Sequence, residues 1–348
     1  MSTNNQMTTA RRLTRRELLR VATVGGVGAV LAACGVASQS APTVAPTSAP
    51  AAIGASPGAY PRTIQDKFGV VAIPARPQRI MNFYGNAGLD ALLALGEKPV
   101  LISTYDGFIL QPWQAAANDV PFLIMSAGVP NQEKVFAEGI DLIITAEYPT
   151  ATQAARDERL PFGDRIPIVS VDQADFEGQL RIIGDALALE EAAAAKAAEV
   201  AQLFADFQPA RMPVTVKAFG NYEDGKFWMY REASGLGAML KRFGLPALSA
   251  PTTIGDQESD PEAVQAISFE AMQELEADLL IGTDFGAGYR IESVAASPLF
   301  QQLQAVQDGR FVVFDLTESM ATCYGSVLSI PAARDALTKA LTAYAAAA

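Results

Sequence analysis

The feature that most constrains the fold is a pair of similar segments on either side of one helical stretch. The segment 133–141 (EKVFAEGID) runs into the apolar residues LIIT, and the segment 270–278 (EAMQELEAD) runs into LLIG. In each segment a Glu stands eight positions before an Asp, and a strand-like run follows. A second pair, 92–96 (LLALG) and 240–244 (LKRFG), is typical of helix ends with a glycine cap. The chain is therefore predicted to contain two similar halves that arose by duplication.

The stretch between these halves, 190–208 (EEAAAAKAAEVAQLFADFQ), has a high helix propensity. It is rich in Ala and Glu and contains neither Gly nor Pro. Pro209 follows it and should end the helix. One apolar stripe at helical spacing is formed by Val200, Leu203, Phe204 and Phe207. We expect a single long α-helix that bridges the two halves.

Both halves alternate strand-like and helix-like runs. The strands predicted in the first half are 79–84, 99–104, 140–146 and 166–171, and those in the second half are 214–220, 227–231, 278–283 and 311–316. Such an alternation predicts the α/β class, with two doubly wound lobes built on mostly parallel sheets. The predicted N-terminal lobe is 62–174, its last part and the bridging helix are 175–211, and the C-terminal lobe is 212–348.

The first 33 residues are typical of an export signal. Arg15 and Arg16 form a twin-arginine pattern, although these and the other arginines could equally be the basic start of an ordinary secretion signal. The apolar run 21–33 is too short to span a bilayer. The segment 31–34 (LAAC) resembles the lipobox of bacterial lipoproteins, which predicts acylation of Cys34. Residues 34–61, rich in Ala, Pro, Ser and Thr, should form a flexible tether from a lipid anchor to an extracytoplasmic domain.

The composition excludes several classes of chemistry. The chain contains no histidine, which rules out Ser-His and Cys-His catalysis and the imidazole ligands of typical zinc sites and of haem with a proximal His. Its net charge of −12 argues against nucleic acid as a partner. The only cysteines are Cys34 and Cys323, so acylation of the first would leave no intramolecular disulfide. Met320 and Cys323 could line a pocket or simply fill space.

Candidate ligand-binding residues follow the predicted strands, because ligands of parallel α/β sheets lie beyond the carboxyl ends of the strands. In the first half these residues are Tyr84, Tyr105 and Tyr148. In the second half they are Trp228, Arg231, Phe285, Tyr289 and Arg290. The tyrosines could form a stacking wall or merely pack at a rim. An aromatic side chain beside an Arg occurs twice, which favours a bulky, planar, anionic ligand. The alternative is that Trp228 and Tyr230 are strand residues that face opposite sides, so that at most one reaches the ligand.

Several motifs together resemble one protein family. In chain order they are 77–80 (PQRI), 90–100 (DALLALGEKPV), 131–135 (NQEKV), 141–144 (DLII), 268–271 (SFEA), 277–280 (ADLL) and 297–310 (SPLFQQLQAVQDGR). The ordered set is similar to the iron-siderophore and cobalamin substrate-binding proteins of ABC importers, over residues 62–345. The resemblance implies two α/β lobes bridged by one helix, with the ligand held between them.

The resemblance also implies a function. The protein would be a monomer that captures a ferric siderophore, without catalysis, metal site or cofactor, and delivers it to an ABC permease dimer. By motif position, Glu133 and Glu270 would contact the permease. Within the same family cobalamin, or haem bound through a tyrosine, remains an alternative. From another class, a secreted carboxylate-dependent hydrolase could use the acidic loop 256–262, but that loop lacks the apolar setting that raises a carboxyl pKa.

Overall fold

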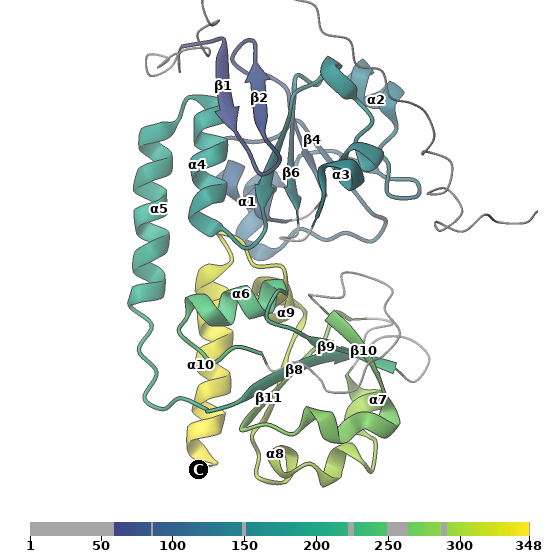
Figure 1. The fold of residues 1–348 in the computed structure, drawn as a ribbon, viewed down its shortest axis with the longest axis vertical. Coiled ribbons are helices and arrows are strands. Elements are labelled where there is room, and N and C mark those ends of the chain that lie inside the picture. The colour runs from purple at the N-terminus through teal and green to yellow at the C-terminus, as the bar shows by residue number, and fades with distance from the viewer. Residues whose placement is uncertain are drawn as a thin grey trace, which may run out of the picture. The chain divides into compact units, whose positions relative to one another are not determined.

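The computed structural model describes residues 59–84, 86–147, 151–221, 226–248, 264–286 and 291–347. The predicted sites at Cys34, Tyr148, Tyr289 and Arg290, and the acidic loop 256–262, lie outside these residues. The described chain forms two five-stranded sheets with helices packed on them, one sheet in each predicted half (Figure 1). This confirms the predicted α/β class with two lobes. No helix of the described ranges has both the length and the apolar character needed to cross a membrane.

The N-terminal lobe begins with a small antiparallel hairpin of β1 and β2, and its sheet follows in the order β5-β4-β3-β6-β7. The bounds of its elements are β1 (Arg62–Gln65), β2 (Val70–Ile73), β3 (Ile80–Phe83), α1 (Asn86–Ala94), β4 (Leu101–Thr104), η1 (Pro112–Ala117), β5 (Phe122–Ile124), α2 (Gln132–Ala137), β6 (Leu142–Glu147), α3 (Gln153–Arg159), η2 (Gly163–Arg165), β7 (Ile168–Asp172), α4 (Phe176–Leu187) and α5 (Glu190–Ala205).

The C-terminal lobe has a sheet in the order β10-β9-β8-β11-β12, in which β8, β11 and β12 occupy the places of β3, β6 and β7. The bounds of its elements are β8 (Val216–Asn221), β9 (Lys226–Tyr230), α6 (Gly235–Arg242), β10 (Val264–Ser268), η3 (Phe269–Leu275), β11 (Leu279–Thr283), α7 (Glu292–Ala295), η4 (Phe300–Gln302), α8 (Gln304–Gln307), β12 (Phe311–Phe314), α9 (Leu316–Cys323) and α10 (Ile330–Ala346). All eight predicted strands exist, with ends within two residues of the predicted ones, whereas β1, β2, β5 and β10 were not predicted.

The two sheets differ in the direction of one hairpin. Every pair in the N-terminal sheet is parallel, and β8, β11 and β12 are parallel to each other. In the C-terminal sheet β9 runs antiparallel to both β8 and β10. After α6 the chain returns beside β8, where Leu248 pairs in parallel with Val216, much as β4 returns beside β3 after α1. The β9 strand is therefore an addition to the plan that the two lobes share.

The duplicated Glu–Asp segments make the same hydrogen bonds in both lobes. The Asp141 carboxylate accepts from the backbone N–H groups of Gln78 and Arg79 at 2.8 and 2.9 Å, directly before β3. The Asp278 carboxylate accepts from the N–H groups of the two residues directly before β8, at 3.0 and 2.8 Å. Each aspartate thus fixes the start of its central strand, and these bonds lower the pKa of Asp278.

The second repeated motif also adopts one geometry in both lobes. Gly96 and Gly244 end α1 and α6 in the left-handed region, with φ of 77° and 72°. After Gly96, the N–H of Glu97 donates to the Leu92 carbonyl at 3.0 Å, and the equivalent bond after α6 measures 2.9 Å. Both are glycine-capped helix ends, as the sequence predicted.

The predicted bridging helix is α5, which ends at Ala205 rather than at residue 208. It packs against α4 in Figure 1, and the contact depends on small side chains. A Cβ atom added at Gly184 would lie 2.4 Å from the Cβ of Ala193, so only glycine lets the two helices approach this closely. The two sheets are therefore connected through the packed pair of α4 and α5 rather than through α5 alone.

The apolar stripe of α5 ties the lobes together through aromatic rings. The Phe204 ring centroid lies 5.6 Å from that of Phe176 in α4 and 4.8 Å from that of Phe243, which caps α6. The Phe207 ring also lies 4.8 Å from Phe243. These rings belong to a continuous cluster of buried side chains that extends from one face of the N-terminal sheet to α10. The opposite face of each sheet is buried by a separate cluster.

Candidate ligand-binding site

The carboxyl edge of the N-terminal sheet presents two of the predicted tyrosines side by side. Tyr84 directly follows β3, and its ring centroid lies 6.2 Å from that of Tyr105, which follows β4. The backbone of Tyr84 has φ of 41°, a left-handed conformation that costs a non-glycine residue on the order of 1–3 kcal/mol. Its N–H donates to the Ser103 carbonyl at 3.0 Å, which helps to hold it there. Such strain is concentrated at functional sites, which supports a binding role for this edge.

The aromatic surface continues from Tyr105 along the loop that follows it. The Phe108 ring lies edge-on to Tyr105 at 5.8 Å and to Phe122 of β5 at 5.6 Å. Tyr105 remains 45% exposed and Phe122 41% exposed. The row of rings therefore offers solvent an accessible stacking surface rather than a closed core.

A buried carboxylate and a cation that were not predicted from the sequence lie at the same edge. Glu147 is the last residue of β6, is buried, and accepts from the Thr145 hydroxyl at 2.9 Å. The Arg159 guanidinium, from α3, pairs with Glu147 and stands 5.8 Å from the ring of Phe83. Arg159 lies twelve residues after the end of β6, so a search of the residues next to strand ends could not find it. Its position in the helix that follows this strand was the available signal.

The C-terminal lobe presents an aromatic pair at its carboxyl edge. Phe285 follows β11, and its ring lies 5.7 Å from that of Tyr324 in a T-shaped arrangement. Tyr324 caps the end of α9 and is 37% exposed. Phe285 was predicted as a site residue from the sequence, whereas Tyr324 was not. These two rings are the C-terminal counterpart of the tyrosine pair in the other lobe.

Trp228 and Arg231 occupy different ends of β9. Because β9 is antiparallel to β8, Trp228 pairs with Gly220 near the carboxyl end of β8, whereas Arg231 follows the opposite end of the hairpin. Both side chains are half-buried. The alternative that Trp228 and Tyr230 face opposite sides is wrong, since residues two apart in a strand share a face. Phe227 and Met229 fill the core on the other face.

Tyr230 and Cys323 form a neutral packed contact instead of a reactive site. The Tyr230 hydroxyl and the Thr283 hydroxyl lie 3.2 Å apart. Burial raises the pKa of Tyr230 well above its usual value and raises the pKa of Cys323 to about 12. Met320 and Cys323 are both buried, so of the two alternatives they fill space. Among the described residues, no group of three acidic or thiol side chains is placed to hold a metal ion.

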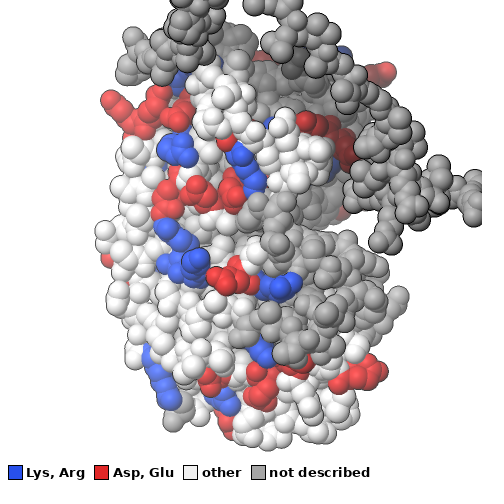
Figure 2. All heavy atoms as spheres, viewed as in Figure 1, with Lys and Arg blue, Asp and Glu red and all other residues white. Residues whose placement is uncertain are grey.

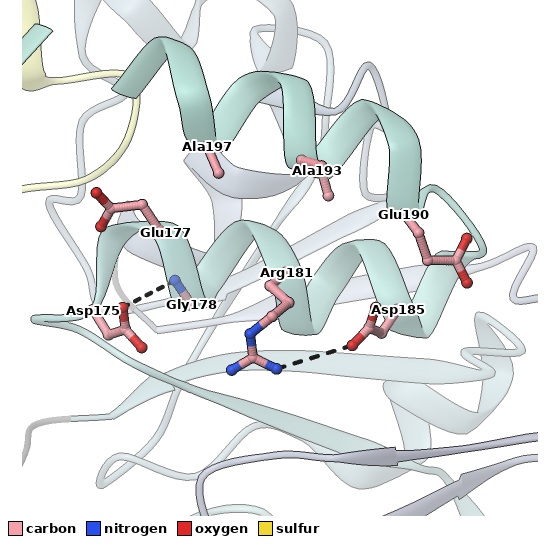
Figure 3. A pocket seen from close by; sticks show the side chains of 9 residues that line it. Asp175, Glu177, Gly178, Arg181, Asp185, Glu190, Ala193 and Ala197 are labelled. Carbon is pink, nitrogen blue, oxygen red and sulfur yellow. Dashed lines mark hydrogen bonds and ion pairs between the residues drawn. The ribbon is translucent and has the colours of Figure 1, made fainter. Parts of the chain in front are cut away.

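A groove of about 360 Å³ lies away from these edges, between α4 and α5 (Figure 3). Its walls are the alanines of α5 and charged side chains of α4, and each charge has a partner. Arg181 pairs with Asp185 at 4.0 Å, and Asp175 accepts from the Gly178 N–H at 3.0 Å. Glu190 pairs with Arg62 at 2.8 Å. The groove is therefore part of the packing between the two helices rather than a ligand site.

The predicted docking carboxylates occupy equivalent positions in the two lobes. Glu133 is the second residue of α2, Glu270 is the second residue of η3, and both are exposed. Hydrogen bonds from its own backbone N–H and from Ser268 lower the pKa of Glu270, so it is fully charged at neutral pH. On the face seen in Figure 2, acidic and basic side chains are interspersed without a continuous basic patch.

Comparisons with known proteins agree with this architecture. A family model described as periplasmic binding protein matches residues 83–316. Streptococcus pneumoniae PiaA, solved in complex with ferrichrome, has a TM-score of 0.61 at 19% identity, with coverage of 81% of this chain and 99% of that chain. Staphylococcus aureus SirA complexed with staphyloferrin B has a TM-score of 0.61 at 20% identity, covering 81% and 98%. The catecholate-siderophore binding protein VctP from Vibrio cholerae has a TM-score of 0.59 at 20% identity, covering 81% and 99%.

A comparison with curated protein sequences gives no match. At these identities the structural likeness shows the fold, while the family match extends over more than half of the chain. The family and the structures named above are substrate-binding proteins rather than enzymes, and the family implies an extracytoplasmic location. Two lobes of one plan, with aromatic side chains at the carboxyl edge of each sheet, suit that role. The chain belongs to the periplasmic binding protein family.

Proposed function

We propose that this protein captures a ferric siderophore outside the cytoplasm and delivers it to an ABC importer. The observation that carries the proposal is the ring pair of the half-buried Tyr84 and the exposed Tyr105, with the Arg159 guanidinium at the same edge. Rings stack on flat chelating groups, and a guanidinium pairs with their anionic oxygens. Among proteins of similar fold, PiaA was solved with ferrichrome, SirA was solved with staphyloferrin B, and VctP is a catecholate-siderophore binding protein.

Binding of cobalamin or haem is the alternative within the family, and nothing in the described residues favours it. Both intrinsic tryptophans give an optical signal, since Trp113 and Trp228 are the only two in the chain. The test is a titration of the purified protein with ferrichrome, ferric staphyloferrin B, a ferric catecholate, cobalamin and haem, followed by tryptophan fluorescence. Saturable quenching by a ferric siderophore is expected. Quenching by cobalamin or haem alone would identify those ligands instead.

Replacing Arg159 with alanine should weaken an anionic siderophore more than a neutral one, because its guanidinium lies at the aromatic edge of the N-terminal sheet. A lost hydrogen bond to a charged group costs about 1.5–3 kcal/mol, or roughly 10- to 100-fold in Kd. The comparison is the Kd for ferric staphyloferrin B against that for ferrichrome. Arg334, which pairs with Asp335 on α10, supplies the control variant Arg334→Ala and should change neither Kd. Equal losses for both ligands in Arg159→Ala would mean that the side chain only packs.

We also propose that the protein is a lipoprotein held at the outer face of the membrane through Cys34, after export by the twin-arginine route. Replacing Cys34 with alanine should move the protein from the membrane fraction to the soluble extracytoplasmic fraction, because no acyl chain could then be attached. Immunoblotting of cell fractions measures this, with Cys323→Ala as the matched control. Retention of the Cys34→Ala protein in the membrane fraction would contradict the lipid anchor.

Finally, we propose that Glu133 and Glu270 dock the two lobes on the permease. Their support is their exposure, their charge and their equivalent places in the duplicated lobes. A permease dimer with two-fold symmetry would offer two matching contacts, one to each lobe. The protein is expected to act as a monomer in this complex.

A further inference from the structure

One fully buried carboxyl lies where the two lobes meet. Asp90 belongs to α1 of the N-terminal lobe, and its side chain has no solvent exposure. Its Oδ2 accepts from the Trp113 indole N–H at 2.8 Å, and its Oδ1 accepts from the Gln114 amide at 2.6 Å. The third donor is the hydroxyl of Ser326, from the turn between α9 and α10 of the C-terminal lobe. The carboxyl thus joins parts of the chain that are 236 residues apart.

Two of the three partners can only donate. An indole N–H has no acceptor atom. The Gln114 amide is fixed in direction because its Oε1 accepts from the Gln111 backbone N–H at 2.9 Å, so its Nε2 must face Asp90. The Ser326 hydroxyl differs from both, since it can donate or accept, and it already accepts from the Ser329 N–H at 3.3 Å. Only the partner from the other lobe can therefore adjust to a change in the charge of Asp90.

The surroundings of Asp90 bring the pH at which its carboxyl ionises close to neutral. Burial raises the pKa of Asp90 to about 7, against the three hydrogen bonds, which lower it. No charged group contributes to this change in pKa. The elements packed around Asp90 carry charges that are paired elsewhere, namely Glu147 with Arg159, Arg181 with Asp185, Glu177 with Arg242, and Glu318 with Lys339.

We propose that Asp90 and Ser326 form a proton-dependent latch between the lobes, in which the hydroxyl donates to the carboxylate and accepts from the carboxylic acid. In the ionised form the bond between the lobes is charge-assisted, which makes it about twice as strong as a neutral one. Protonation removes the buried charge and leaves a neutral bond. Because burial raises the pKa of Asp90 above its ordinary value, ionisation lowers the folding stability as the pH rises toward and through about 7, and the bond from Ser326 offsets part of that loss. The latch is independent of the ligand, so it stands or falls separately from the proposed transport of siderophores.

The test follows Trp113, whose indole is bonded to the carboxyl that titrates. In a Trp228→Phe background Trp113 is the only tryptophan, and its emission is recorded against pH in the ligand-free, full-length protein. One transition with a midpoint near the Asp90 pKa of about 7 is expected. Asp90→Asn should abolish the transition, whereas Asp335→Asn, which removes a carboxylate from the exposed surface of α10, should leave it unchanged.

Variants of Ser326 test whether the titration of Asp90 depends on its bond to Ser326 or on burial alone. Ser326→Ala removes a bond that favours the ionised form, so the midpoint of the transition should move to a higher pH by about 1, whereas Ser326→Thr keeps the hydroxyl and should restore it. The factor by which Ser326→Ala lowers the folding equilibrium constant should be about ten times larger near pH 9 than near pH 5.5. The reason is that only the ionised form of Asp90 depends on the bond that Ser326 donates. These variants retain Asp90, so they test the latch even where Asp90→Asn does not fold.

Two results would overturn the latch. One is an emission transition that persists in Asp90→Asn, because another group would then be titrating. The other is an equal midpoint in Ser326→Ala and the Trp228→Phe parent, because Ser326 would then not sense the charge. Siderophore titrations do not enter this experiment, and a failure to bind any siderophore would leave its outcome intact.

Discussion

Replacing Phe204 with alanine should lower the free energy of unfolding by about 3–5 kcal/mol, the usual range for removal of a buried phenylalanine ring. The ring is only 8% exposed and contacts both lobes, through Phe176 on one side and Phe243 on the other. The Arg242 guanidinium also stands over it, 4.7 Å from the ring centroid. The alanine variant leaves a cavity at the junction that these rings cannot fill without moving α5. Urea denaturation followed by circular dichroism measures the loss.

Phe136→Ala is the matched control. Phe136 is 37% exposed and makes its ring contacts within the N-terminal lobe, with Phe162 at 5.7 Å and with Arg165 at 4.2 Å. Part of its surface is already in water, so its removal should cost about 1–2 kcal/mol. An equal loss in the two variants would show that the junction around α5 is no more important to stability than an ordinary surface ring.

The sequence predicts the shared plan of the lobes well because that plan is encoded locally. Asp141 and Asp278 bind the two N–H groups in front of a central strand, and Gly96 and Gly244 end helices in the left-handed region. Because each role needs a particular residue type, the same residues occur at equivalent positions in both halves of the sequence. The apolar stripe of α5 is likewise a periodic signal that does not depend on its partners.

The missed strands and the direction of β9 depend on weaker signals. The strands β5 and β10 lie at sheet edges, and β5 is only three residues long, which is too short for a clear alternation of buried and exposed positions. The Asp224-Gly225 dipeptide between β8 and β9 is a signal for a tight hairpin, and it would have predicted antiparallel pairing there. With that pairing recognised, Arg231 would not have been placed at the carboxyl edge.

The candidate site was predictable only where its residues follow a strand directly. Tyr84, Tyr105 and Phe285 do so, and the structure pairs each of them with another ring. Arg159 and Tyr324 reach the same edges from the helices that follow β6 and β12, at a distance in sequence from the strand ends. The contact of Asp90 with Ser326 is the extreme case, since neither residue carries a motif for the other and only the folded arrangement of the lobes brings them together.

Replacing Glu133 and Glu270 together with alanine should reduce uptake of the ferric ligand to background while leaving its Kd unchanged. Each carboxylate is exposed at the second position of a helix that precedes the duplicated Asp. Removing one partner of a buried interfacial charge pair costs about 2–5 kcal/mol, so the loss of two should weaken docking by roughly 10³-fold or more. Uptake of the radioactive iron complex by cells, measured beside the Kd of the purified variant, gives both quantities.

Because each lobe carries one of the two carboxylates, the single variants provide a further test of this prediction. If a symmetric permease contacts both lobes, each single variant should retain partial uptake, and the two singles should resemble each other. A matched pair on α5, Glu191→Ala with Glu199→Ala, removes two other exposed carboxylates and should leave uptake intact. Loss of ligand affinity in the double variant would place Glu133 or Glu270 in the binding site. Normal uptake by that variant would mean that the permease recognises other parts of the lobes, and the duplicated Glu would then be retained for helix capping, near the positive end of each helix dipole.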